Sequence, residues 1–246
     1  IPIRIYDHRP DRPDGPVMVF YHGGGWVIGD LDTHDHFCAE AARILDIPVY
    51  AIDYRMGPEH PFPAAPEDCE AATRWIAENK PCTGLVLCGD SAGGNLTIVT
   101  GHALRDNPAD VPVLALHPIY PATSARTDWP SFESFGEGYF LSTAGMAWFN
   151  DQYAPNPADR RAAPLDFPVE GLPPTLLVTA GLDPLRDQGR AYAAKLIEAG
   201  VPTIYREAKG NIHGYISLAQ AIPSSLDDIR GALSVLKSMI AEALNR

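Results

Sequence analysis

Short apolar runs alternate along this chain with longer amphipathic segments, and the alternation predicts an α/β fold. The runs are brief and bounded by Gly, Pro or charged residues, which is typical of strands in a buried sheet. They lie at residues 1–6, 16–21, 47–53, 85–88, 111–117, 175–180 and 203–206. Because strands joined by helices lie parallel, we expect a mostly parallel sheet with helices on both faces.

The amphipathic segments repeat their apolar residues every three or four positions, as helices do. They cover residues 32–45, 67–79, 95–104, 142–152, 187–199 and 225–244. Asp32 or Thr33 is the expected N-cap of the first, and Gly200 follows the fifth at the position where a left-handed residue ends a helix. The last segment carries Asp227 and Asp228 in its first turn, where they favour the helix dipole.

Residues 118–174 break this rhythm. Aromatic side chains are spread there among Pro, Ser and Asp, and only 142–152 has a helical pattern. So long a connection between two strands is commonly a lid or a binding loop. We therefore expect a single domain over 1–246 with a cap inserted at 118–174.

Composition excludes some classes of function. The 246 residues carry a net charge of −12 and no long run of Lys or Arg, so we expect no nucleic-acid partner and no anionic membrane partner. No apolar run is long enough to span a bilayer, so membrane insertion is not expected. The four cysteines form no C-x-x-C pair and are expected to be free thiols, and no metal site is expected: Cys38, Cys69, Cys82 and Cys88.

The strongest chemical signal is Gly89-x-Ser91-x-Gly93, between the apolar run 85–88 and the helical segment that follows it. A sharp strand-to-helix turn needs residues without a Cβ on both sides of the central serine. Such a turn lifts the hydroxyl above the sheet beside the free N–H groups of a helix N-terminus. Ser91 is therefore predicted to be a nucleophile.

A serine nucleophile needs a base, and the position of each histidine narrows the choice. His102 lies eleven residues along the following helix, about 16 Å from Ser91 at 1.5 Å per residue, which is too far. His22 and His117 end strands and stay possible, although either could simply anchor a loop. His213 follows the last strand and is the only histidine in the later part of the chain. We predict that His213 is the base.

The acid that orients this base is expected after the strand at 175–180. Asp183 lies there in Thr179-Ala180-Gly181-Leu182-Asp183. Asp187 is the competing candidate, but it fits better as a cap or first-turn residue of the next helix. The predicted triad is Ser91, Asp183 and His213.

A tetrahedral intermediate also needs N–H donors for its oxyanion. The run of glycines after the strand at 16–21 can bring its backbone close to an acyl group, and we predict Gly23, Gly24 and Ala92 as the donors. A flexible turn or a phosphate cradle is the alternative, but no Lys follows the glycines. Trp26 is expected to bind the acyl side of a substrate or to pack in the core.

Together these segments resemble the hormone-sensitive-lipase-like esterases, the bacterial family IV carboxylesterases. The resemblance runs over most of the chain and follows the order of the family's motifs. The segments that carry it are His22-Gly23-Gly24-Gly25-Trp26, Asp53-Tyr54-Arg55 with Pro58-Glu59 and Phe62-Pro63-Ala64, Gly89-Asp90-Ser91-Ala92-Gly93-Gly94, Asp183-Pro184-Leu185-Arg186-Asp187, and His213-Gly214.

The resemblance implies an α/β-hydrolase fold, cytoplasmic hydrolysis of short-chain esters, no cofactor and the same triad and oxyanion residues. Relatives also suggest a homodimer. The family's N-terminal cap helices are not evident here, so 118–174 is the expected cover. Gln188 stands where Glu is common, and Tyr215, where Phe is common, borders the base and is expected to affect substrate binding.

Two other functions remain open on the sequence alone. One is a small-molecule receptor on the same fold, like the plant gibberellin receptors, which lack the catalytic histidine; His213 argues against it. The other is amide or lactone hydrolysis by the same triad, which no residue distinguishes from ester hydrolysis.

Overall fold

A central sheet carries the fold, with strand order β1-β3-β2-β4-β5-β6-β7 in the computed structural model, which describes residues 1–9 and 11–245. β1 runs antiparallel to β3, and the other neighbouring pairs are parallel. The predicted parallel α/β sheet is thereby confirmed. The strands are β1 (Ile3–Tyr6), β2 (Gly15–Tyr21), β3 (Val49–Ile52), β4 (Cys82–Asp90), β5 (Val113–Ile119), β6 (Thr175–Leu182) and β7 (Thr203–Ile212).

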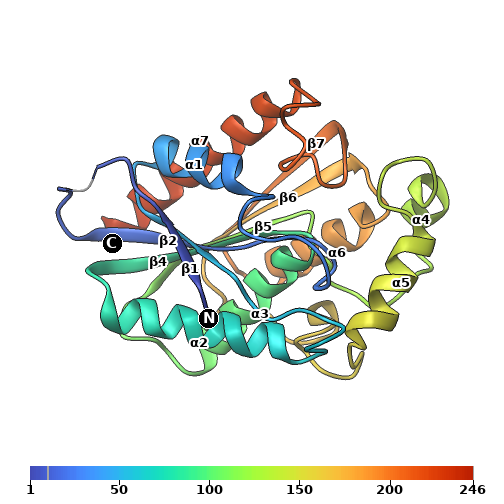
Figure 1. Ribbon diagram of the computed structural model, residues 1–246, viewed down its shortest axis with the longest axis horizontal. Coiled ribbons are helices and arrows are strands. Elements are labelled where there is room, and N and C mark those ends of the chain that lie inside the picture. Colours follow the sequence, from blue (N-terminus) through green and yellow to red (C-terminus); the bar gives the residue numbers. More distant parts are fainter. Residues whose placement is uncertain (10, 246) are drawn as a thin grey trace.

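Helices cover both faces of the sheet (Figure 1). α1 (Asp35–Leu45) and α7 (Ser225–Leu244) pack on one face. α2 (Ala64–Asn79), α3 (Ala92–Asp106) and α6 (Arg186–Glu198) pack on the other. Two short helices, α4 (Pro130–Phe135) and α5 (Thr143–Tyr153), lie to one side of this sandwich, away from both chain ends in Figure 1.

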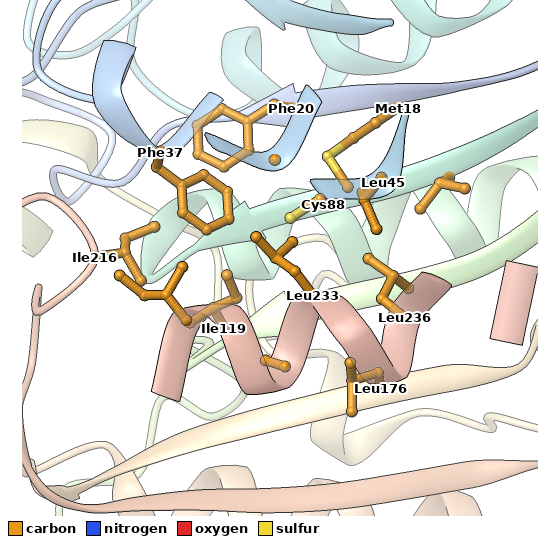
Figure 2. Close-up of a cluster of buried hydrophobic side chains, with 14 of the residues drawn as sticks. Met18, Phe20, Phe37, Leu45, Cys88, Ile119, Leu176, Ile216, Leu233 and Leu236 are labelled. Atoms are coloured by element: carbon orange, nitrogen blue, oxygen red, sulfur yellow. The ribbon is translucent and has the colours of Figure 1, made fainter. Parts of the chain in front are cut away.

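The alternation of side chains along the strands divides the core in two. In β2, Met18 and Phe20 point to the face under α1 and α7, whereas Val17, Val19 and Tyr21 point to the other face. Figure 2 shows the first cluster, in which the two β2 side chains approach residues of α1 and α7. All five are almost fully buried. A strand buried on both faces reads as a continuous apolar run, which is why the sequence reveals it.

Some predicted details are wrong. The first helix has His34 as its N-cap, not Asp32 or Thr33. The reason is local, because the carboxylate of Asp30 accepts the N–H groups of Asp32 and Thr33 and builds a separate turn ahead of the helix. Gly200, with φ of 75°, does follow the end of α6 as predicted.

The insertion at 118–174 holds more helix than its pattern predicts. Besides α5, it contains α4 and the 3-10 turn Pro164–Asp166, and its first two residues belong to β5. α4 has six residues, too few for a periodic signal. Contacts distant in sequence hold it instead, because Ser131 donates through N to Asp187 Oδ2 (2.9 Å) and through Oγ to the Pro184 carbonyl (2.6 Å).

Three further findings concern the described residues. No helix within 1–9 and 11–245 has the length and apolarity to cross a bilayer. In the same ranges, no group of His, Cys, Asp and Glu side chains is arranged to hold a metal ion. The four cysteines are free, as predicted, and three of them are buried.

His117, in β5, should make stability depend on pH. Burial lowers the pKa of His117 to about 4 from 6.5, although Nδ1 lies 2.9 Å from the Leu176 carbonyl. Between these two pH values the unfolded chain binds a proton that the folded protein does not, so the free energy of unfolding falls as pH falls. The full effect is about 3 kcal/mol at 1.36 kcal/mol per unit. The free energy of unfolding, measured with urea at several pH values from 7.5 to 4.5, should fall less steeply with pH for His117→Gln than for the wild type. An equal slope in the two proteins would contradict this origin.

Candidate active site

Ser91 lies between β4 and α3 on a strained turn. Its φ of 56° and ψ of −117° are outside the regions that most residues adopt. The turn is held by Ser91 N donating to the Ile119 carbonyl (2.9 Å), and it leaves no room for side chains beside it. A Cβ at Gly93 would overlap the Tyr21 carbonyl, and a Cβ at Gly89 would overlap the same oxygen. The need for both glycines, predicted from the sequence, is confirmed.

His213 and Asp183 meet Ser91 above the sheet. Asp183 follows β6, His213 follows β7, and Ser91 follows β4, so all three leave the carboxyl ends of parallel strands. His213 Nε2 lies 2.7 Å from Ser91 Oγ, and Nδ1 lies 2.7 Å from Asp183 Oδ2. The carboxylate can only accept, so Nδ1 carries the proton and Nε2 of the neutral ring is free to accept from the serine hydroxyl.

The partners of this histidine are held rigidly. Asp183 is fully buried, and its other oxygen accepts the N–H of Leu185 (2.8 Å). The ring of Tyr120 packs on His213 with centroids 4.7 Å apart. Asp187, the competing acid, instead accepts from Ser131 and pairs with Arg186 in the first turn of α6. The structure thus brings Asp183, rather than Asp187, to the histidine.

The other histidines weighed as candidate bases, two at strand ends and one in α3, make structural contacts. His22 Nδ1 lies 2.7 Å from the Gly23 carbonyl, and burial lowers the pKa of His22. His102 lies 3.3 Å from the Tyr192 hydroxyl, and burial lowers its pKa to about 3. Together with His117, these rings remain neutral near pH 7, and none of the three is hydrogen-bonded to Ser91, Asp183 or His213.

The glycine loop after β2 requires a correction. Gly23 was predicted to donate to an oxyanion, but its N–H already donates to Asp90 Oδ1 (2.8 Å). Within the described part of the chain, the N–H groups of Gly24 and Gly25 have no acceptor. Gly25 lines the same pocket as Ser91 and Ala92, and Gly23 does not. The N–H of Gly23 is therefore occupied, whereas Gly25, which the sequence did not single out, lies at the pocket beside Ser91.

Asp90 fixes this loop to the serine turn. Its buried carboxylate accepts from Gly23 N, lies 3.0 Å from His34 Nε2 and accepts the Tyr120 hydroxyl (3.2 Å). Burial raises the pKa of Asp90, but His34 and the Gly23 N–H outweigh burial and lower it overall. A Cβ on Gly23 would come within 2.6 Å of Asp90 Oδ2. Asp90 thus holds the glycine loop beside Ser91 through the hydrogen bond from Gly23 N and through close packing against Gly23.

A pocket of about 310 Å³ opens over Ser91. Trp26 forms part of its wall and stacks on Tyr153 with centroids 4.7 Å apart, so it is both pocket lining and packed core. Tyr215, predicted to contact substrate, does not line this pocket. It is 1% exposed and packs edge-on against Tyr120, because the chain turns after His213 and directs the next side chain inward.

The insertion at 118–174 supplies most of the remaining lining. α5 packs directly on the glycine loop, since a Cβ on Gly25 would overlap the ring of Phe149. Both apolar and polar residues of the insertion line the pocket. These are Phe132, Leu141, Met146 and Phe149, and Ser124, Arg126, Asn150 and Asp151.

Comparisons with known proteins identify the family of the chain. A family model described as α/β hydrolase fold matches residues 18–217. Carboxylic ester hydrolase LipN of Mycobacterium tuberculosis is 40% identical over an alignment of 260 positions, which covers 98% of this chain and 68% of the relative. Ethyl acetate hydrolase of Pseudomonas putida is 37% identical, over 90% of this chain and 73% of the relative.

Solved structures of esterases have the same fold as this chain. The crystal structure of a thermostable esterase from Pseudomonas putida ECU1011 superposes with a TM-score of 0.92 at 31% identity. The match covers 97% of this chain and 78% of that one. An esterase from the archaeon Pyrobaculum calidifontis superposes with a TM-score of 0.91 at 36% identity, over 96% of this chain and 81% of the other.

Proposed function

The chain belongs to the hormone-sensitive-lipase-like α/β hydrolases and is a carboxylic ester hydrolase, and from this premise we propose that it cleaves short-chain esters through Ser91, His213 and Asp183. One observation carries the proposal. An unbroken line of hydrogen bonds, each 2.7 Å long, joins the serine hydroxyl through the imidazole to a buried carboxylate. This is the arrangement that activates a serine nucleophile.

In the first step, Ser91 Oγ attacks the ester carbonyl carbon while its proton passes to His213 Nε2. The carbonyl electron pair moves to the oxygen, and the tetrahedral intermediate forms. Asp183 stabilises the imidazolium without taking its proton. When the intermediate collapses, the C–O bond to the alcohol breaks and His213 protonates the departing oxygen. An acyl ester on Ser91 remains.

In the second step, water attacks this acyl ester, again with His213 as base. The proton of the water moves to Nε2, and the acid product leaves as Ser91 Oγ takes the proton back. We assign the oxyanion in both steps to the N–H groups of Gly24, Gly25 and Ala92. Two adjacent backbone donors and the N-terminus of α3 then face one oxygen, the arrangement typical of an oxyanion hole.

The insertion at 118–174 acts in this proposal as a cap that sets the size of the acyl group. Its apolar side chains, with Trp26, bound the pocket of about 310 Å³ over Ser91. The side chains of the cap are proposed to limit how far an acyl chain can extend from Ser91. The short-chain preference itself is supported by the similarity to the Pseudomonas putida ethyl acetate hydrolase, which is 37% identical to this chain.

A panel of p-nitrophenyl esters from acetate to laurate tests both parts of the proposal. We expect kcat/KM to be highest for the short acyl groups and to fall for chains too long for the pocket. Acid quenching during turnover, followed by peptide mass spectrometry, should find the acyl mass on the peptide that contains Ser91. Label on another residue would contradict the assigned nucleophile, and equal rates across the panel would contradict the role of the cap.

A further inference from the structure

The carboxamide of Gln188, in α6, is fixed in one orientation at the wall of the pocket. Its Oε1 accepts the N–H groups of Thr123 (2.6 Å) and Ser124 (2.9 Å), and the Thr123 hydroxyl lies 3.3 Å away. A backbone N–H can only donate, so the oxygen must face the loop. The NH₂ group therefore faces the opposite way.

That NH₂ group is directed at the pocket over Ser91. Gln188 lines this pocket, although only 1% of the residue is exposed. Within residues 1–9 and 11–245, no acceptor lies within hydrogen-bonding distance of Nε2, and the atom is not sealed inside the protein. The side chain thus offers N–H donors to whatever fills the pocket.

An unpaired donor in a largely apolar pocket favours a ligand that can accept a hydrogen bond there. Leu185, one turn before Gln188 in the chain, and Ala122 and Ala162 line the same space and offer no polar side-chain atom. A hydrocarbon group placed against Gln188 would displace water from the NH₂ group without accepting a hydrogen bond in its place. An oxygen at the same point would be held.

We propose that Gln188 is a specificity-determining residue that selects esters carrying a second oxygen acceptor, such as an ether or a ketone, besides the ester group that is cleaved. The inference rests on the proposed ester hydrolysis at Ser91 and deepens it. A neutral acceptor fits better than an anion, because the carboxamide has no charge and the chain carries −12. Arg126, the cation in the lining, is already paired with Asp128 at 2.9 Å.

The Q188E variant separates this role from the anchoring of the loop. A glutamate has nearly the same shape and can still accept from Thr123 and Ser124, and those two N–H groups favour its ionised form. It has no N–H donor for the pocket. The change therefore removes the proposed contact and keeps the structural one.

Matched ester pairs, each an ether beside its hydrocarbon isostere, give the measurement. On the acyl side they are p-nitrophenyl methoxyacetate with butanoate, and the methoxypropanoate with pentanoate. On the alcohol side they are methoxyethyl butanoate with butyl butanoate. For each pair, kcat/KM for the ether is divided by kcat/KM for the isostere, and this ratio is compared between wild type and variant. The comparison cancels the intrinsic reactivity of each ester. We expect the ratio to fall about tenfold in Q188E at pH 8 for at least one pair, the size of one lost hydrogen bond.

The Q188M variant, which loses both the donor and the anchor, completes the test. It should lower the ratio as Q188E does and also lower the melting temperature. If Q188E melts at the wild-type temperature and its ether-to-isostere ratio of kcat/KM is unchanged for every pair, the inference is overturned. A fall in this ratio in Q188M alone would also overturn it. If the wild type hydrolyses no member of any pair, the proposed ester hydrolysis fails instead, and the two failures are distinct.

Discussion

Replacement of Ser91 by alanine is expected to lower kcat for p-nitrophenyl butanoate by about 10⁶-fold, the size of effect seen when a serine nucleophile is removed. The substitution deletes the only atom in the site that forms the acyl bond in the proposed mechanism. It should not disturb the fold, because the φ of 56° at this position is set by the backbone around Gly89 and Gly93. Circular dichroism and the melting temperature should match those of the wild type.

The matched control is Ser234→Ala in α7. Ser234 is exposed, and its hydroxyl donates to the Arg230 carbonyl. α7 packs beside α1 on one face of the sheet, and none of its residues lines the pocket. It should retain wild-type kcat. If S91A kept more than a small fraction of activity after repurification, another residue would have to supply the nucleophile.

Much of this site can be predicted from the sequence because its chemistry depends on rare side chains at constrained positions. Ser91 lies between two glycines at the end of an apolar run, and a single histidine follows the later strands. Chain order then points to Asp183. Each of these signals can be found in the sequence without knowing how the loops pack.

The free N–H groups of the glycine loop could not be identified in this way. Gly23, Gly24 and Gly25 are identical as residues, and each offers one backbone N–H. Which of them is free depends on Asp90, 67 positions after Gly23, whose carboxylate captures the first N–H. A tertiary hydrogen bond therefore makes a distinction that the three glycines cannot show by themselves. The acidic residue before the serine was the one available signal.

The directions of side chains could not be predicted from the sequence either. Tyr215 lies two residues from His213, and proximity in sequence suggested contact with substrate. Its ring is instead buried against Tyr120, because the chain turns at Gly214, where φ is 77°. Gln188 shows the reverse case, since the sequence marks it only as a departure from the common Glu, whereas its side chain reaches the pocket from α6.

Asp183→Asn is expected to lower kcat by about 10⁴-fold, equivalent to about 5.5 kcal/mol of transition-state free energy. Asparagine fits the same space, but its NH₂ group can donate to Nδ1 and hold the imidazole with the proton on Nε2. His213 would then present a donor to Ser91 and could not take its proton. KM should change little, because Asp183 is fully buried and does not line the pocket.

Asp187→Asn gives the matched control, since the two aspartates lie four positions apart and only one contacts His213. Asp187 bonds to Ser131 and Arg186, so its loss should weaken the attachment of α4 and lower the melting temperature. It should leave kcat within a fewfold of the wild type. An equal loss of kcat in both variants would mean that the carboxylates act through the local fold, and the orientation of His213 by Asp183 would then have no support. A large loss in D183N alone, at unchanged KM, assigns the effect to the tautomer of His213.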